Sequence, residues 1–466
     1  MKLNLFKKSG CMALLYYFAI LPITPYIHAQ SHSVGERSLQ ESSDPIMNQS
    51  MTVSITDYAD AMGGISGEEL VEMAFRRNAE LLAARQRMTE AQGLLIQAGL
   101  RPNPGFEVDV SNGSILGSPG ERELTLGYAH TFELGGKRKG RMELAKVGVE
   151  LAQLEIADRE RQLKADIKAR YGEALAAIRD LETAEQLLEL NQQGYQITMA
   201  RVRQGEAAAV EQGLLQVEVG RLESDRLLFE NQVTRAILEL KTLAGMNLDE
   251  PLRLSGDLSA PPIIISLTEA TEQAIGERPD LKAAQLEEKL GEAEVRLAHA
   301  EVIPDVISFA RYSRVSSRFD QFGLNGAGAL VPMRDTDNLI NAGVSITLPT
   351  RNRNQGNIQA AIARQAAARL RRQFIEQVVR REVNAALSRY ETAHRAMEIF
   401  NQQVINQAQD NLRIIRDGYN LGELRVFDVI NEQRRLADTQ KAYTEVLKEY
   451  YLALVELERA IGGPIR

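Results

Sequence analysis

An internal repeat of about 200 residues is the feature that most restricts how this chain can fold. The string Glu-Leu-Leu-Ala-Ala at 80–84 matches Asp-Leu-Lys-Ala-Ala at 280–284, and Pro104 matches Pro304 at the same offset. Further matches follow in the same order at larger offsets: Arg170-Tyr171 with Arg389-Tyr390, Gly205 with Gly422, and Gly245 with Gly462. Ordered matches of this kind indicate a duplicated unit.

Each half of the chain has the same predicted order of a helix, a proline, a pair of strands and two long helical stretches. The leading helices are expected at 67–99 and 267–301. The long stretches are expected at 138–190 and 196–243, then at 355–416 and 424–460, with glycines near both junctions (Gly194 and Gly205, Gly418 and Gly422). Fifty helical residues span roughly 75 Å, so such hairpins must pack side by side.

The repeat defines the predicted domain organisation. We predict a first repeat at 65–263, with strands at about 105–134 and a helical hairpin at about 138–243. The second repeat is predicted at 264–466, with strands at about 305–349 and a hairpin at about 355–460. The composition, rich in charged residues (25%) and poor in aromatic ones (5%), is typical of long helices.

The predicted strands alternate apolar and polar residues. Apolar side chains occupy every second position in three segments: Phe106, Val108 and Val110; Leu124, Leu126, Tyr128, His130 and Phe132; and Ile340, Ala342, Val344, Ile346 and Leu348. Such alternation is what a lipid-facing barrel requires. Half-buried strands of a soluble sheet alternate in the same way, so this reading stays open.

The number of strands favours an assembly of several chains. Closed membrane barrels need at least about eight strands, and this chain supplies four. A cyclic assembly would close the sheet between copies, and three copies would give twelve strands.

The amino terminus is predicted to be an export signal at residues 1–29, followed by a flexible extension at 30–64. Lys2, Lys7 and Lys8 precede an apolar run that ends before Pro22, and cleavage is expected after Ala29. The single cysteine, Cys11, would be removed with the signal. No later segment has eighteen consecutive apolar residues, so we expect any membrane entry to be as a barrel.

The charge of the chain argues against a nucleic-acid partner. Residues 1–29 hold three lysines and no acidic residue, so their removal leaves 63 acidic residues against the 55 basic residues less these three. The resulting formal charge is about −11.

Several motifs resemble those of a known family, the TolC-like outer membrane efflux proteins, and within it the outer-membrane components of cobalt-zinc-cadmium type cation efflux systems. The most specific is the string Phe132-Glu133-Leu134-Gly135-Gly136-Lys137-Arg138, which is similar to that subgroup's strand-to-helix junction. Residues 100–104, ending in Pro104, resemble its helix-to-strand entry, and residues 278–281 its second-half start. The segment from Gly422 to Ile430 resembles the glycine-led helix near the family's periplasmic tip.

The resemblance implies an α+β membrane protein that forms a homotrimer. Its strands would make a twelve-stranded barrel among outer-membrane lipids, continuous with a long periplasmic α-barrel. It also implies two protein partners, a periplasmic adaptor (membrane fusion) protein and an inner-membrane pump of the RND type. Such a channel conducts without catalysing a reaction.

Asp428 is the candidate gate residue at the periplasmic tip, because three copies of its carboxylate around a constriction would bind cations and repel anions. The alternative is an ordinary solvated helix residue. Glu107, Asp109 and Glu123 are the candidates for an acidic barrel lumen. The first repeat has Glu211 where the second has Asp428, so the two tips are expected to differ.

No cofactor, catalytic group or dedicated metal site is predicted. After residue 29 the histidines are His32, His130, His299 and His394, which are far apart and have no cysteine beside them. The leading hypothesis is the outer-membrane duct of a tripartite efflux system, exporting divalent heavy-metal cations. The alternatives are a multidrug or type I protein-export channel of the same fold, and a soluble periplasmic coiled-coil scaffold without a pore.

Overall fold

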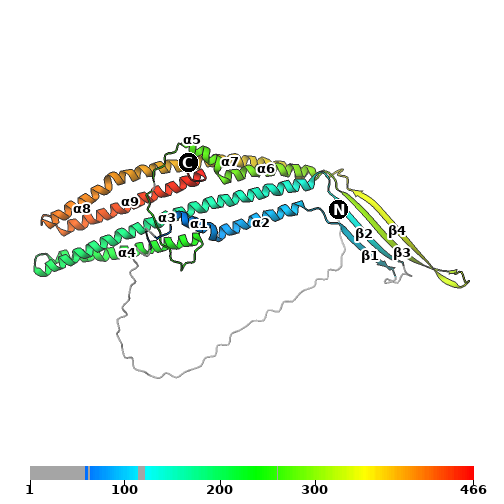
Figure 1. Cartoon of the computed structure of the whole chain (residues 1–466), viewed down its shortest axis with the longest axis horizontal. Helices are drawn as coiled ribbons and strands as arrows, with labels where there is room; N and C mark the ends of the chain where they lie inside the picture. Colours follow the sequence, from blue (N-terminus) through cyan, green and yellow to red (C-terminus); the bar gives the residue numbers. More distant parts are fainter. Residues whose placement is uncertain (1–57, 61–62, 114–120, 260, 466) are drawn as a thin grey trace, which may run out of the picture. The chain divides into compact units, whose positions relative to one another are not determined.

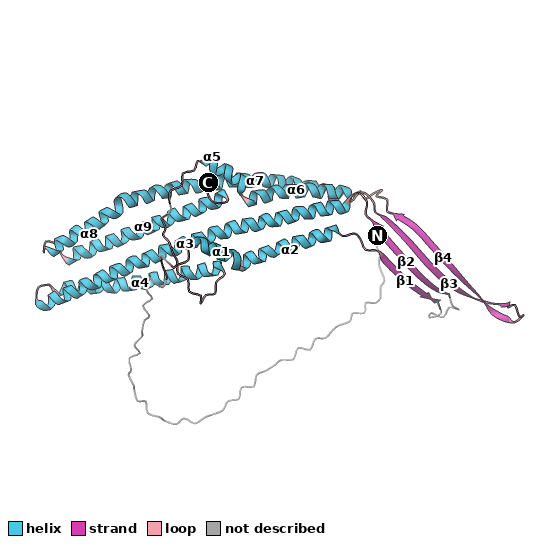
Figure 2. Ribbon diagram, viewed as in Figure 1, coloured by secondary structure: helices cyan, strands magenta, loops and turns pink. Residues whose placement is uncertain are grey.

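The structure, a computed structural model, describes residues 58–60, 63–113, 121–259 and 261–465. The predicted export signal and most of the predicted extension (30–64) lie outside these residues. The described part consists of long helices and one four-stranded sheet (Figures 1 and 2). Within it, no helix has both the length and the apolar character needed to cross a bilayer.

Both repeats have the same order of elements. The first repeat contains α1 (Gly67–Arg77), α2 (Ala79–Gly99), β1 (Gly105–Asn112), β2 (Arg122–Phe132), α3 (Lys137–Gln204) and α4 (Ala209–Ala244). The second contains α5 (Leu267–Glu277), α6 (Pro279–Ala300), β3 (Val306–Leu324), β4 (Leu330–Ile346), α7 (Gln355–Ile399), a π-helical turn η3 (Phe400–Val404), α8 (Ile405–Asn420) and α9 (Val426–Ile461).

The leading helix of each repeat is two helices, where the sequence predicted one. A serine begins each first helix, and a glutamate three residues on completes a capping box (Ser66 with Glu69, Ser266 with Glu269). The backbone then becomes extended at one residue, which is Asn78 in the first repeat and Arg278 in the second. The amide of Asn78 still donates to the carbonyl of Ala74, and that of Arg278 to the carbonyl of Ala274. The same residue is thus the C-cap of one helix and the N-cap of the next.

The turn of the first hairpin lies at residues 205–208, and the predicted break near Gly194 is wrong. Gly194 lies inside α3, which runs for 68 residues, about 100 Å. An interior glycine costs a helix only about 1 kcal/mol relative to alanine, which packing of α3 against α2, α4, α6 and α9 can offset. The chain turns at Gly205 instead, where φ is +79°, a left-handed conformation that favours glycine.

The four strands form a single antiparallel sheet in the order β1-β2-β3-β4. Because β2 pairs with β3, the sheet joins the two repeats, while β1 and β4 are its edges. β3 and β4 continue beyond the ends of β1 and β2 as a two-stranded ribbon (Figure 2). β2 leads directly into α3, so the sheet begins where the long helices begin.

The two largest apolar cores lie among the helices, one formed mainly by each repeat. The first surrounds Leu70, Ile167 and Leu240, and the second surrounds Val383, Tyr450 and Leu457. Tyr58 and Asp60, at the end of the predicted flexible extension, exchange backbone hydrogen bonds with Leu254. These last residues of the predicted extension therefore belong to the folded part of the chain.

Candidate functional site

The strand register sorts the alternating residues onto two faces of the sheet. Directly paired residues share a face, and Tyr128, for example, pairs with both Phe106 and Ala310, and Ala310 with Ala342. The apolar residues named above in β1, β2 and β4 therefore all lie on one face, which we call the apolar face. It consists of the even-numbered paired residues of 106–112, 122–132, 306–318 and 334–346. The odd-numbered ones form the polar face.

The apolar face is uncovered in the single chain. Phe106 is 72% exposed, Val344 62% and Ile340 80%. Large apolar side chains left in contact with water along β1, β2 and β4 need another covering.

The polar face carries all three candidate lumen residues, Glu107, Asp109 and Glu123. The structure adds a partner that the sequence did not indicate. Arg311 of β3 lies on the same face, and its guanidinium is 3.0 Å from the Glu107 carboxylate. Asp335 and Asp337 of β4 also lie there. The face therefore has an excess of carboxylates, with one of them neutralised by Arg311.

Small and hydroxyl side chains pack closely on the polar face. Thr125 and Ser313 are buried there and share a hydrogen bond of 2.8 Å between their hydroxyls. Gly343 is covered by the ring of Phe309, which a Cβ would approach to 2.7 Å. The polar face is thus closely packed in its middle, and the Glu107–Arg311 pair lies between these two packed rows.

The strand-to-helix motif of residues 132–138 builds the junction between sheet and helices. Glu133 forms two bonds with Arg141, 2.5 and 2.9 Å long, and these lower its pKa against the smaller effect of burial. Lys137 pairs with Asp305 at 2.7 Å, which also accepts from the Leu134 amide. These bonds fasten the start of α3 to the start of β3.

The remaining motif residues explain why the junction needs glycine and arginine. Gly135 has a φ of +71°, and a Cβ there would come within 2.8 Å of Ile303. Gly136 is also left-handed and precedes α3. Arg138 donates to the carbonyl of Gly99 at 2.6 Å, which joins α3 to the end of α2, and Pro104 lies directly before β1. The motif therefore joins the sheet to α2 and α3 at this junction.

The two hairpin tips differ in the bonding of Glu211 and Asp428. Both residues occupy the third position of their helix, α4 or α9. The Asp428 carboxylate accepts a hydrogen bond of 2.9 Å from the Arg425 amide and so caps α9. Within the described residues the Glu211 side chain forms no such bond. Gly422, with a φ of +81°, makes the turn before α9. Asp428 therefore has a structural role that sequence reasoning missed.

The second hairpin is fastened to the first by a buried carboxylate that sequence reasoning also missed. Glu218 of α4 is 3% exposed and accepts from Arg434 of α9 at 3.0 Å and from Arg221 at 2.8 Å. Burial raises the pKa of Glu218, but the bonds and charges of the two arginines lower it more, so the net shift is downward. Only the spacing of Glu218 and Arg221 is visible in the sequence.

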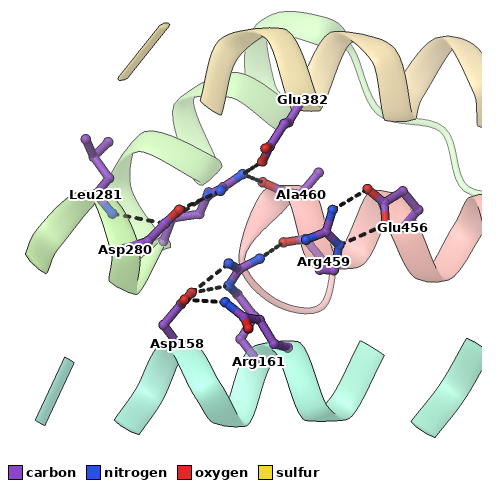
Figure 3. Close-up of polar contacts among 10 residues, drawn as sticks. Asp158, Arg161, Asp280, Leu281, Glu382, Glu456, Arg459 and Ala460 are labelled. Carbon is purple, nitrogen blue, oxygen red and sulfur yellow. Dashed lines mark hydrogen bonds and ion pairs between the residues drawn. The ribbon is translucent and has the colours of Figure 1, made fainter. Parts of the chain in front are cut away.

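A second ionic network joins four helices in the middle of the molecule. Arg278 is 3% exposed and bonds to Asp280, to Glu382 of α7 and to the carbonyl of Ala460 of α9. Beside it, Arg161 of α3 bonds to the carbonyl of Arg459 at 2.6 Å (Figure 3). Burial raises the pKa of Asp280, but the Arg278 bonds outweigh this and lower it overall. The network ties α3, α6, α7 and α9 together.

The described residues contain no group of three or more His, Cys, Asp or Glu side chains placed to hold a metal ion. His130 lies on the apolar face, His299 at the end of α6 and His394 in α7. His32 lies outside the described part of the chain.

Comparisons with known proteins match nearly the whole described chain. The family model described as "Outer membrane efflux protein" matches residues 70–246 and 270–463. The cobalt-zinc-cadmium resistance protein CzcC of Cupriavidus metallidurans is 24% identical over 407 residues, which are 86% of this chain and 91% of the relative. The nickel-cobalt-cadmium resistance protein NccC of Alcaligenes xylosoxydans xylosoxydans is 28% identical over 65% of this chain and 64% of the relative.

Solved structures share the fold. A crystal structure of CusC, from a study of its folding and transmembrane channel formation, superposes with a TM-score of 0.68. The alignment covers 85% of this chain and 92% of that one at 18% identity.

Proposed function

Because the chain belongs to the outer membrane efflux protein family, we propose that it is the exit duct of a tripartite efflux system for divalent heavy-metal cations. The family's members are channels of the Gram-negative outer membrane that reach into the periplasm. The observation that best supports the proposal is the two-sided sheet, with an exposed apolar face and an acidic polar face on strands that cannot close within one chain.

A homotrimer would remove the unpaired edges of this fold. β1 and β4 each pair on one side only within the described residues. The helices that continue these edges, α2 and α7, expose large apolar side chains, including Ile96 (69%) and Phe374 (67%). Pairing β4 with β1 of the next copy would satisfy the edge strands and cover these side chains. Three copies would give a closed sheet of twelve strands, a size found among membrane barrels.

Two lines of support favour metal cations as cargo. CzcC and NccC are resistance proteins for cobalt, zinc, cadmium and nickel. The polar face, which would line the barrel, carries Glu107, Asp109, Glu123, Asp335 and Asp337. Rings of carboxylates favour cations over anions. A duct of this kind needs a periplasmic adaptor and an inner-membrane RND-type pump as partners, and the tips of the helical hairpins would meet them.

The periplasmic gate is proposed at Asp428. Its carboxylate caps α9 directly after the Gly422 turn, so its position is fixed relative to the tip. Three copies near the axis would concentrate cations at that point.

Membrane insertion is tested with a matched pair of neighbouring residues in β4. Ile340 is on the apolar face and Asn341 on the polar face, and both are exposed. Ile340→Arg places a charge in lipid and should cost roughly 2–4 kcal/mol near the midplane, so little heat-modifiable oligomer should reach the outer-membrane fraction. Asn341→Arg should assemble normally. Equal assembly of the two variants, or a soluble periplasmic monomer in the wild type, would refute the proposal.

The cargo is tested by export from cells. Cells lacking this chain should accumulate zinc, cobalt or cadmium, and the wild-type chain should restore export. Accumulation of organic drugs with unchanged metal content would favour the multidrug channel instead.

A further inference from the structure

The charged side chains of the sheet are separated by sign between its two faces. All five carboxylates of the paired strand residues lie on the polar face, at Glu107, Asp109, Glu123, Asp335 and Asp337. Four of the five arginines lie on the apolar face: Arg122, Arg314, Arg318 and Arg334. We call these four the outer arginine cluster. The fifth, Arg311, is the partner of Glu107 on the polar face.

The outer arginine cluster is compact. Arg318 and Arg334 are direct cross-strand partners, whose Cβ atoms stand about 5 Å apart in such pairs. Arg122 pairs with Ser316, which lies between Arg314 and Arg318 along β3. It is therefore a diagonal neighbour of both arginines, at about 7–8 Å. All four side chains are exposed.

The paired residues of this face hold no carboxylate to balance the charge, and Asp320, two residues beyond Arg318, lies in the bulge outside the paired ladder. None of the four arginines forms an ion pair within the described part of the chain. Like charges placed directly opposite each other destabilise a sheet. An anion bound between the guanidinium groups of Arg318 and Arg334 would therefore stabilise this pair.

The cluster lies at one end of the apolar band. The band begins at Val306, beside the helices, and Arg314 and Arg318 lie eight and twelve residues further along β3. With 3.3 Å per residue and a strand tilt of about 40°, these arginines lie about 20 and 30 Å above Val306. An outer-membrane barrel has an apolar band about 25 Å tall. The cluster is thus at the level where acyl chains meet headgroups. It lies toward the end of β3 away from the helices, since β3 begins at Val306 beside them and runs outward (Figure 2).

We propose that the outer arginine cluster is a binding site for the phosphate groups of lipid headgroups in the outer leaflet. The inference rests on the proposed function, because it requires the sheet to span the outer membrane. Arginine binds phosphate through two parallel N–H bonds, and two opposed guanidinium groups can hold one phosphate between them. The outer leaflet of Gram-negative membranes presents such groups on the phosphorylated glucosamines of lipid A.

The same geometry excludes the polar face as the anion site. Glu123 and Asp337 share a row with Val315 on that face, and Asp335 is next to them along β4. Their charges repel phosphate, so the lipid is held on the outside of the barrel while cations pass inside.

Lipid binding is tested on the purified full-length oligomer in detergent micelles. Native mass spectrometry would follow titration with bisphosphorylated lipid A and with the same lipid after removal of both phosphates. The wild type should bind the phosphorylated form about tenfold more tightly or better, the size expected from one or two charge-assisted bonds. Inorganic phosphate alone should not reproduce this binding.

Matched double variants locate the site. Arg318→Gln/Arg334→Gln should lose about tenfold in affinity for phosphorylated lipid A, which removes most of the preference. Arg381→Gln/Arg395→Gln removes two exposed arginines of α7 and should bind like the wild type. Equal binding of the two lipids by the wild type, unchanged affinity in the first variant, or equal binding of inorganic phosphate would overturn the inference.

Conductance of the same preparations in planar bilayers separates the two proposals. Channels that form without a preference for phosphorylated lipid A would overturn only the lipid site. Failure to form channels with either lipid would overturn the proposed function, and the lipid site with it.

Discussion

The two repeats keep the same backbone but hold it together differently. Gly245 and Gly462 end the last helix of each repeat in a left-handed conformation, and a Cβ on either would come within 3.0 Å of the residue-77 backbone or the Arg278 side chain. In both repeats, the side chain of the residue between the two leading helices donates a hydrogen bond to the backbone carbonyl that lies two residues before this glycine. Asn78 bonds to Leu243 and Arg278 to Ala460.

The difference lies in charge. Asn78 is a neutral cap that also bonds to the Leu81 amide, whereas Arg278 is a buried cation with two carboxylate partners, Asp280 and Glu382. The first hairpin has one unbroken helix, α3, while the second is interrupted by η3 and capped by Asp428. Duplication thus preserved the positions where the backbone needs a particular conformation and left the side-chain partners free to diverge.

The largest expected difference between the repeats is at residues 78 and 278. Arg278→Ala should destabilise the protein by about 3 kcal/mol, the lower end for a broken buried ion pair, because its carboxylate partners Asp280 and Glu382 are only partly buried. Asn78→Ala should cost about 1 kcal/mol, the usual loss of a helix cap. Thermal unfolding followed by circular dichroism would measure both. Equal costs would show that the two network positions are energetically equivalent.

The contact between the hairpins should have a smaller effect. Glu218→Gln removes the charge shared by Arg221 and Arg434 and should cost about 1–3 kcal/mol, since both arginines are half exposed. Glu206→Gln, in the turn of the same hairpin, should change stability little. If Glu218→Gln unfolds at the wild-type temperature, the bridge does not join the hairpins.

The Glu218 bridge should also depend on pH. Its pKa is lowered in the folded protein, so its contribution is present above the unfolded value of about 4.3 and is lost as pH falls through the lower folded value. The stability gap between wild type and Glu218→Gln should therefore be largest near neutral pH and should shrink below about pH 4. A gap that stays constant from pH 7 to pH 3 would contradict this sign.

The smallest expected effect on stability is at the tips. Asp428→Ala should cost about 1 kcal/mol through loss of the α9 cap, whereas Glu211→Ala in α4 should cost less because its side chain forms no cap. Asp428→Asn keeps an oxygen for the Arg425 amide and removes the charge. If Asp428 is the gate, both Asp428 variants should change single-channel conductance and weaken block by multivalent cations, while Glu211→Ala should not. Unchanged conductance in Asp428→Asn would leave the residue with its capping role alone.

The sequence by itself determined the features that depend on local spacing. The duplication, the long hairpins and the alternation in the strands were all predicted. Helix and strand periods can be recognised from the spacing of apolar residues within a short segment. The turn at Gly422 was predicted for the same reason, whereas the first turn was predicted near Gly194 and lies at Gly205. The break at Asn78 was missed, although an asparagine can begin a helix, because the apolar pattern continues across it.

The tertiary structure alone decided which distant residues meet. Glu218 and Arg434 are 216 residues apart, and nothing in the local pattern of either one indicates the other. The four outer arginines lie on three strands, and a slip of one residue in the register of any strand would move its arginines to the opposite face. The facing of these charges is therefore set by strand pairing across the two repeats, which depends on the packed sheet as a whole.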